Sequence, residues 1–416
     1  MKLEIILFFN SKIKNLLFLV NFVILPIFGL SQPCLPEGII FSSQAEIDSF
    51  QFNNPNCLQI QGNVTISGND IVNLNGLNGI TSIDGYLWIH DNPNLLSIAG
   101  LNSLSLIGSH LRIEFNVALP SLNGLNQLSF IGGKLNLVAN TSMPNLTGLE
   151  GLTKIGGDLW IGYNTALSSL SGLSELTTIV GGLDINDDNA LVNLHGFDKL
   201  DSIGGYLWIG NNTALASLSG LENLHIVGGY LFIGNDSVLI NLTGLNNLIT
   251  IGGHVSIKLN HSLSSLEGIE NIVAGTITNL LIYSNPSLSH CAVNSICTYL
   301  LNPTGTVEIH DNLIGCNSQL EVDSTCQFLT TESLRNPGNI SLYPNPASTY
   351  ATINVTDSFS NIYVTIQNTM GELLLEQESI GPQIILDVRP FPYGIYFVKV
   401  FRSSGVKCLK LIKDQN

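Results

Sequence analysis

The stretch GLEGLTKIGGDLWIGYNTALSSLS, residues 148–171, decides the fold because close copies of it recur at a fixed interval. Each copy begins with a glycine, and these glycines lie 24 residues apart from Gly76 to Gly268 without a slip. Counted from that glycine, the pattern is G-L-x-x-L-x-x-I-G-G-x-L-x-I-x-x-N-x-x-L-x-x-L-x. A period of this length is too short for paired helices and is typical of one coil of a β-solenoid.

The pattern within each unit predicts where its side chains lie. Positions 12 and 14 belong to a short strand and point inward, and the leucines at positions 2, 5, 20 and 23 fill the rest of the interior. The glycines at positions 9 and 10 turn the chain into the strand. The Asn at position 17 follows the strand, where it can satisfy buried backbone groups, one above another along the stack.

The strand pattern extends beyond the strict repeat. GNVTISGN (62–69) matches before the first unit and GTVEIHDN (305–312) matches after the last, so the sequence predicts eleven parallel strands. At about 4.8 Å per strand, this sheet would be roughly 50 Å long. We therefore expect an all-β chain dominated by one solenoid.

Three tryptophans, the only ones in the chain, share position 13 of the repeat. Because this position lies between the two inward residues, strand alternation points the tryptophans outward. Other aromatic residues lie on the same face at positions 13 and 11. The candidate ligand-binding residues are Trp88, Trp160, Trp208, Phe232, Tyr206 and Tyr230.

Two interpretations of these aromatic residues stay open. Aromatic rings on a flat polar sheet are suited to stacking on sugar rings or to anchoring a protein partner. They also form cross-strand ladders that stabilise a sheet. Non-aromatic residues interrupt the column at position 13, which weakens the case for a continuous ligand track. They are Arg112, Asn136, Asp184 and Ser256.

The sequence carries no catalytic or nucleotide-binding motif that we recognise. The glycine pairs recur along the repeat, each before a strand, and are not followed by the Lys and Ser or Thr of a phosphate loop. Asp184, Asn186 and Asp188 match the first half of a calcium loop, but Asn189 and His195 replace its glycine and closing glutamate. We expect a solvated corner there, no metal, no cofactor and no catalytic residues.

Residues 1–32 have the features of a secretory signal peptide, with lysines followed by an apolar run of about 15 residues. That run is shorter than the ~20 residues that span a bilayer. The segment holds three Lys and one Glu, which leaves 12 of 15 basic and 30 of 31 acidic residues, a net charge of −18. Nucleic acid and anionic membranes are therefore poor partners, since both need clustered basic residues, and we expect no nucleic acid to bind.

The cysteines lie before and after the repeat, as expected for an exported solenoid whose open ends are capped. A cap at residues 33–60 should hold one disulfide, and short helices after the last coil should hold two. Four cysteines permit three pairings there, and we favour joining the two that fall at nearly the same place on successive coils. The favoured pairs are Cys34–Cys57, Cys291–Cys316 and Cys297–Cys326, while Cys408 has no predicted partner.

The repeat resembles the receptor L domain, the single-stranded right-handed β-helix of insulin-receptor-type ectodomains, and is related to the leucine-rich repeat. The units that carry this resemblance, such as LWIGNN (207–212), extend over about residues 52–315. We place the solenoid with its C-terminal cap at residues 61–326. The resemblance implies a fold and a tendency to bind other molecules, but no particular ligand.

After a polar linker at residues 327–339, residues 340–416 alternate apolar and polar in short strands, which predicts a small immunoglobulin-like sandwich. This segment resembles the type IX secretion C-terminal sorting domain of Bacteroidetes. The resemblance implies passage through the outer membrane by the type IX machinery, removal of the domain, and release or attachment to surface lipopolysaccharide. It is carried by Tyr343, Pro344, Asn345, Pro346, Gly371, Gly394, Tyr396, Lys410 and Lys413.

Together these features predict a secreted protein, or one at the outer surface of a Bacteroidetes-type bacterium. We expect the solenoid to bind glycan or protein without catalysis, through its outer sheet face around residues 206–234. The alternatives are a structural surface protein without a specific ligand, and an enzyme that acts on polysaccharides.

Overall fold

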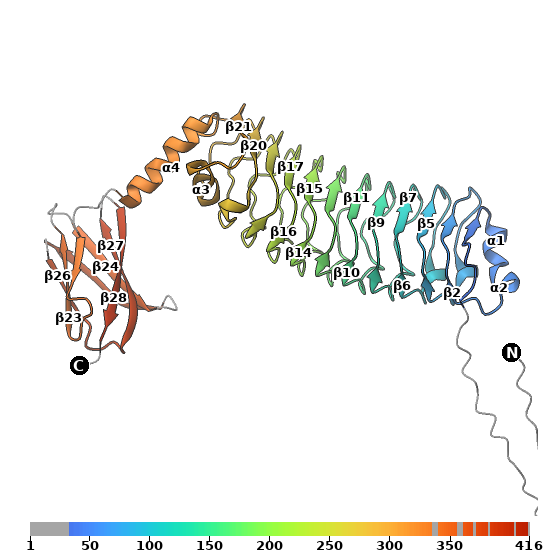
Figure 1. The fold of residues 1–416 in the computed structure, drawn as a ribbon, viewed down its shortest axis with the longest axis horizontal. Coiled ribbons are helices and arrows are strands. Elements are labelled where there is room, and N and C mark those ends of the chain that lie inside the picture. Colours follow the sequence, from blue (N-terminus) through green and yellow to red (C-terminus); the bar gives the residue numbers. More distant parts are fainter. Residues whose placement is uncertain are drawn as a thin grey trace, which may run out of the picture.

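The computed structural model describes residues 33–334, 340–355, 361–368, 372–381, 383–402 and 405–414. The predicted signal peptide lies outside the described residues. Within the described part of the chain, no helix has the length and apolar composition that a membrane crossing requires. The fold is all-β: a β-solenoid comes first, and two small antiparallel sheets follow it (Figure 1).

A twelve-stranded parallel sheet, here called the long sheet, runs along one side of the solenoid (Figure 1). The eleven strands that the repeat predicts are all present. A twelfth, β1 (Ile39–Phe41), comes from the N-terminal cap and pairs with β3 (Val64–Ile66). The others are β5 (Leu87–His90), β7 (Leu111–Glu114), β9 (Leu135–Val138), β11 (Leu159–Gly162), β13 (Leu183–Asn186), β15 (Leu207–Gly210), β17 (Leu231–Gly234), β19 (Val255–Lys258), β20 (Leu280–Tyr283) and β21 (Val307–His310).

A second parallel sheet, made of nine two-residue strands, lies on the opposite side of the coils (Figure 1). The repeat pattern predicts one strand per coil and misses this sheet, because a two-residue strand has no alternation to detect. Its inward residue is the Ile or Val of position 8. The strands are β2 (Gln59–Ile60), β4 (Ser82–Ile83), β6 (Leu106–Ile107), β8 (Phe130–Ile131), β10 (Lys154–Ile155), β12 (Thr178–Ile179), β14 (Ser202–Ile203), β16 (Ile226–Val227) and β18 (Thr250–Ile251).

Glycines occupy corners where successive coils approach closely. At the turn between the two sheets, a Cβ on Gly204 would lie 2.2 Å from the Val180 carbonyl oxygen of the preceding coil. The first glycine of the repeat is equally constrained. Gly148 has a φ of +118°, and a Cβ there would lie 2.1 Å from the Leu122 carbonyl oxygen. A side chain is excluded at Gly204 by lack of space, and at Gly148 by both space and backbone conformation.

The interior consists of apolar side chains stacked in register. Leu159 on β11 pairs with Leu183 on β13, and Ile161 pairs with Ile185, and all four are fully buried. The same register continues along the long sheet, so each core residue lies on the equivalent residue of the next coil. No coil buries its apolar side alone, and neighbouring coils therefore stabilise each other.

The residues at position 17 form a buried ladder at the corner after each long-sheet strand. Asn116 is representative: its Nδ2 donates to the Ile89 carbonyl at 2.9 Å, and its backbone N–H donates to Oδ1 of Asn140 at 3.2 Å. This is the role predicted for these asparagines. Asp188 and Asp236 replace Asn in two coils and are also fully buried. The expected solvated corner is therefore wrong for Asp188, because this residue occupies an interior ladder position.

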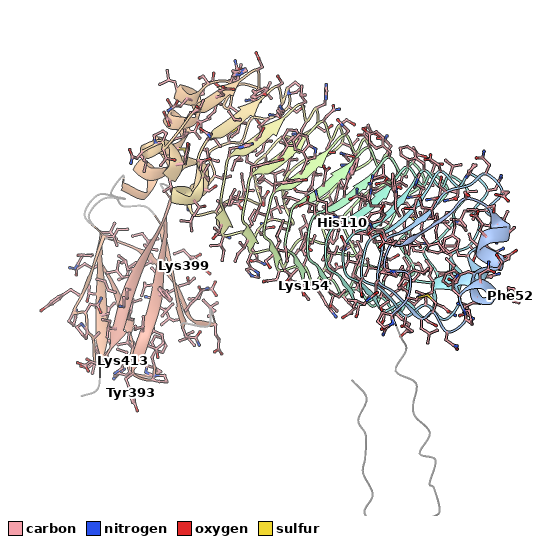
Figure 2. The ribbon with its side chains drawn as sticks, turned by 45° about the vertical axis from the view of Figure 1, so that its right-hand side comes forward. Phe52, His110, Lys154, Tyr393, Lys399 and Lys413 are labelled. Atoms are coloured by element: carbon pink, nitrogen blue, oxygen red, sulfur yellow. A yellow bond between two sulfur atoms is a disulfide. The ribbon has the colours of Figure 1, made fainter. Side chains whose placement is uncertain are left out.

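Helices and disulfides lie at both ends of the solenoid. The helix α1 (Gln44–Asp48) is followed by α2 (Phe50–Asn53), whose Phe52 lies at the end of the solenoid in Figure 2. After the last coils come α3 (Asn294–Leu301) and α4 (Gln319–Leu334). Three short 3-10 helices are η1 (Asn75–Leu77), η2 (Ala99–Leu101) and η3 (Ala274–Thr276). The disulfides are Cys34–Cys57, Cys291–Cys316 and Cys297–Cys326, the pairs that the sequence favours.

The helix α4 continues into residues 327–334, which belong to the predicted linker, and residues 335–339 lie outside the described residues. The C-terminal segment then forms two antiparallel sheets that share one apolar core. One sheet has the order β22-β23-β26 and the other β25-β24-β27-β28. The strands are β22 (Ile340–Tyr343), β23 (Tyr350–Val355), β24 (Asn361–Asn368), β25 (Leu373–Ile380), β26 (Gln383–Asp387), β27 (Gly394–Arg402) and β28 (Gly405–Lys413).

Candidate binding face of the long sheet

The outer face of the long sheet carries most of the aromatic residues singled out by the sequence. On β15, Leu207 and Ile209 are fully buried, whereas Trp208 between them is partly exposed. The register places Trp160, Asp184, Trp208 and Phe232 side by side on β11, β13, β15 and β17. Position 13 therefore points outward, as strand alternation predicts.

Five rings on the coils of β15, β17 and β19 form two stacks that meet edge to face; we call them the aromatic cluster. They are Tyr206, Trp208, Tyr230, Phe232 and His254. The Trp208 and Phe232 ring centres are 3.7 Å apart, with planes inclined by 13°. Tyr230 stacks on Tyr206 at 5.1 Å and on His254 at 4.8 Å. These contacts form the cross-strand ladder that was one interpretation of the column, and they leave Tyr206, Trp208 and Tyr230 partly exposed.

Trp88 lies apart from the other candidate residues, because β7 and β9 separate its strand from β11. Its ring stacks on His90 at 3.8 Å, and the Arg112 guanidinium lies 4.3 Å from the ring centre. The indole Nε1 donates to Oε2 of Glu114 at 3.1 Å, and Arg112 forms an ion pair with the same carboxylate at 2.8 Å. The ring of Trp88 is thus covered by His90 and Arg112.

Trp160 is different, because no aromatic ring or cationic group stacks on it among the described residues. Its neighbours in register are the short polar residues Asn136 and Asp184. The indole Nε1 donates to Oδ1 of Asn186 at 3.3 Å. The indole lies over Gly162, where a Cβ would be 2.8 Å from Nε1. The glycine at position 15 therefore makes room for the ring.

A depression of about 310 Å³ opens beside Trp160. It is lined by Lys134, Asn136, Asp158, Trp160, Asp184 and Tyr206. Position 11 is a glycine on this coil alone among the repeats, and the Tyr206 ring that lines the depression leans over it: a Cβ on Gly182 would lie 2.5 Å from Cε1. The glycine at position 11 is the one sequence feature that marks this coil, and the repeat pattern alone does not predict the depression.

The polar groups of the depression differ in how fully they are satisfied. Asp158 uses both oxygens: Oδ2 lies 2.9 Å from the Lys134 ammonium, and Oδ1 accepts the Gly182 N–H at 2.8 Å. Burial acts to raise the pKa of Asp158, but these hydrogen bonds outweigh it and lower the pKa. By contrast, burial and the nearby Asp187 raise the pKa of Asp184 to about 6. The buried Oδ1 of Asp184 has no hydrogen-bond partner within the described residues.

No cluster of three or more His, Cys, Asp or Glu side chains suited to a metal ion occurs among the described residues. The half calcium loop is not assembled, because Asp188 lies in the buried ladder. Its backbone N–H donates to Asn212 and its Oδ1 accepts from Asn164.

The residues of the predicted sorting motif meet at the last strand of the C-terminal sandwich. The side-chain amide of Asn345 forms two hydrogen bonds with β28. Its Nδ2 donates to the Lys410 carbonyl at 2.6 Å, and its Oδ1 accepts from the Ile412 N–H at 2.8 Å. The ammonium of Lys413 donates to the Ser348 carbonyl. Lys413 pairs with Gly394 across the β27–β28 ladder, and it is labelled in Figure 2. The YPNP start is thus joined to the end of the chain.

The remaining residues of the predicted sorting motif differ in their burial. Tyr396 on β27 is buried, and its hydroxyl donates to the Pro392 carbonyl. Tyr343 is largely exposed at the end of β22. The bonds before Pro344 and Pro346 are cis. Gly371 lies outside the described residues.

The chain is thus a β-solenoid followed by a small sandwich of two antiparallel sheets. Residues 56–132 match the family model of the Receptor L domain, and residues 341–414 match that of the Secretion system C-terminal sorting domain. No curated protein matches the chain. The first match covers the opening coils, while the same coil geometry continues to β21. The second match implies type IX export to the surface or exterior of a Bacteroidetes-type cell.

Proposed function

We propose that the chain is an exported, non-catalytic binding or adhesion protein that recognises glycan or protein through the outer face of the long sheet, between β9 and β19. The observation that supports this most is the partly exposed group of aromatic side chains beside an open depression. Aromatic rings with a free face and polar neighbours provide both contact area and hydrogen bonds to a ligand.

Hydrolysis of a glycosidic bond is the second candidate, and one observation favours it. Asp158 and Asp184 line the same depression with pKa values shifted in opposite directions, which is a pattern of acid–base pairs. Asp158, however, is engaged at both oxygens by Lys134 and Gly182, so it is not free to act as a base or nucleophile. Binding without hydrolysis therefore fits the contacts better.

A purely structural role is the third candidate. The stacking within the aromatic cluster favours it, since such ladders stabilise a sheet without any ligand. It does not account for Trp160, whose ring has no stacking partner of this kind among the described residues. A structural ladder gives no reason for this exposed ring beside a partly buried carboxylate.

The test is to probe the purified chain against an array of glycans and bacterial surface proteins, beside a Trp160→Ala/Trp208→Ala variant. Binding that is lost in the variant, with an unchanged circular-dichroism spectrum and melting temperature, is the expected result. Binding that survives the double change would overturn the role of this face. A complete lack of binding would favour the structural role. Release of reducing sugar from a bound glycan, lost in Asp184→Asn, would favour hydrolysis.

A further inference from the structure

We infer that the depression beside Trp160 is a subsite for one uncharged pyranose ring of a glycan, with Trp160 as the stacking platform and Asp184 as a hydrogen-bond acceptor. This inference rests on the proposed binding function and names the ligand class of one site within that face.

The stacking platform follows from a comparison of the three tryptophans. Trp88 is covered by His90 and Arg112, and Trp208 is covered on one side by Phe232. Trp160 has only Asn136 and Asp184 beside it in register. The axial C–H groups of a pyranose pack well on such an uncovered aromatic face.

Asp184 supplies the hydrogen-bond acceptor of the subsite. Asp184 is partly exposed, and its carboxylate accepts no hydrogen bond among the described residues; its Oδ1 is buried, so Oδ2 is the oxygen that can accept from a ligand. The register places Asp184 between Trp160 and Trp208, two strands that lie about 10 Å apart. A hydroxyl group of a ring lying between these tryptophans can donate to the carboxylate.

The charges of the lining disfavour an acidic ligand. The Lys134 ammonium is paired with Asp158, so the Asp184 carboxylate is the charge left over, and it opposes a uronic or sialic acid. A sugar ring carries hydroxyls that donate and accept, which matches a lining with both the Asn136 amide and carboxylate oxygens. An arginine or lysine side chain only donates.

The size of the depression also suits one ring. Its volume of about 310 Å³ lies at the small end of the range of roughly 300–1,000 Å³ for small-molecule sites. It is open on the outer face of the sheet, so the bound ring can belong to a longer glycan whose neighbouring residues pass over the aromatic cluster.

Saturation-transfer NMR on the purified chain tests the inference, with neutral tetrasaccharides of glucose, mannose, galactose and N-acetylglucosamine as probes. We expect transfer to the ring C–H protons of at least one probe. Trp160→Ala and Asp184→Asn should each weaken its binding at least tenfold. Trp88→Ala is the matched control, a tryptophan at the same repeat position with a covered ring, and should change binding less than twofold. Gly182→Ala, which displaces the Tyr206 ring, should also weaken binding.

A tetragalacturonate and a tetra-arginine peptide complete the experiment and separate its outcomes. Binding of the peptide alone, lost in Asp184→Asn, would overturn the sugar assignment and leave the proposed binding face intact. Binding of the acidic sugar alone would overturn the neutral assignment. Transfer that is unchanged in both Trp160→Ala and Asp184→Asn would place the sugar elsewhere. No transfer to any probe at millimolar concentration would overturn the subsite, while array binding would still decide the proposed function.

Discussion

The backbone N–H of Asn164 donates to Oδ1 of Asp188 at 2.8 Å, in the middle of a ladder that is otherwise built mainly from asparagines. In the flanking coils, the Asn side chain also donates from Nδ2 to a strand carbonyl. Asn164 donates to Leu137 and Asn212 donates to Ile185. The Oδ2 of Asp188 replaces that donor, is buried and has no partner within the described residues. Asp188 therefore fits the ladder best when it is protonated.

The solenoid should lose stability as the pH rises from about 4 to 7. Burial raises the pKa of both Asp188 and Asp236 from 3.8 to about 7, and the carboxylates of Asp187 and Asp184 add to the effect at Asp188. The folded chain then holds protons that the unfolded chain releases, so the free energy of unfolding falls across this window. Asp188→Asn/Asp236→Asn should remove this loss. The gain at pH 8 should be on the order of 4 kcal/mol per site at most, at about 1.4 kcal/mol per pKa unit.

Urea unfolding of the wild-type chain and the double variant at pH 4, 6 and 8 measures this difference. The two curves should nearly coincide at pH 4, where a protonated Asp can itself donate, and should separate as the pH rises. Asp84→Asn, at an exposed position, is the control and should show no such separation. A difference between the ladder variant and wild type that is independent of pH would contradict the account.

An asparagine of the buried ladder should contribute more to the free energy of unfolding than an exposed asparagine does. Asn140→Ala leaves the Ile113 carbonyl and the Asn116 N–H without their partners in a buried corner. Each unsatisfied group costs about 1–3 kcal/mol, so a loss of roughly 2–5 kcal/mol is expected in chemical unfolding. Asn102→Ala, at an exposed position, should change stability by less than about 0.5 kcal/mol. Equal losses in the two variants would argue against a buried ladder.

The first glycine of the repeat should not tolerate a side chain. In Gly148→Ala the backbone would be strained at a φ of +118°, and the new Cβ would collide with the Leu122 carbonyl oxygen. We expect a loss of several kcal/mol and a clearly lower melting temperature. Gly275→Ala is the matched control, because a Cβ there would meet nothing within 4 Å. If both variants have the melting temperature of the wild type, the coil geometry described for position 1 is wrong.

Export should depend on the contact between the YPNP start and the last strand. Asn345→Ala removes two hydrogen bonds to β28, so the sandwich should be loosened and less of the chain should reach the cell surface. Cell fractionation and surface proteolysis measure this. Deletion of residues 341–414 should leave the chain in the periplasm. Ile385→Thr, at an exposed position of β26, should be exported normally. Undiminished surface display of the deletion variant would contradict the sorting assignment.

Regular features were predictable from the sequence, and features of a single coil were not. Apolar residues equivalent to Leu207 and Ile209 recur in every unit, so their burial and the strand they define followed from alternation alone. The two-residue strand Ser202–Ile203 is too short to show a pattern. Asp188 lies in a polar stretch that resembles a calcium loop, and only its place at position 17, where other units have Asn, indicates that it is buried.

The candidate site was predictable in outline only. The column of outward aromatic residues was visible, but which rings remain uncovered depends on how neighbouring coils pack. Trp88 and Trp160 occupy the same repeat position, yet Arg112 covers one and the shorter Asn136 and Asp184 leave the other open. The position of the Tyr206 ring in the lining depends on Gly182 of the preceding coil, which leaves room for it, and this contact between coils is not visible in the sequence.

Hydroxyl-radical footprinting with mass spectrometry tests the central claim most directly, that ligands are bound on the outer face of the long sheet. The purified chain would be labelled alone and with a bound glycan or protein identified on the array. The account predicts reduced oxidation at Trp160, Tyr206 and Trp208 on binding, and unchanged oxidation at Trp88. Protection confined to the opposite sheet, for example at the exposed Leu106 and Ile226, would contradict it.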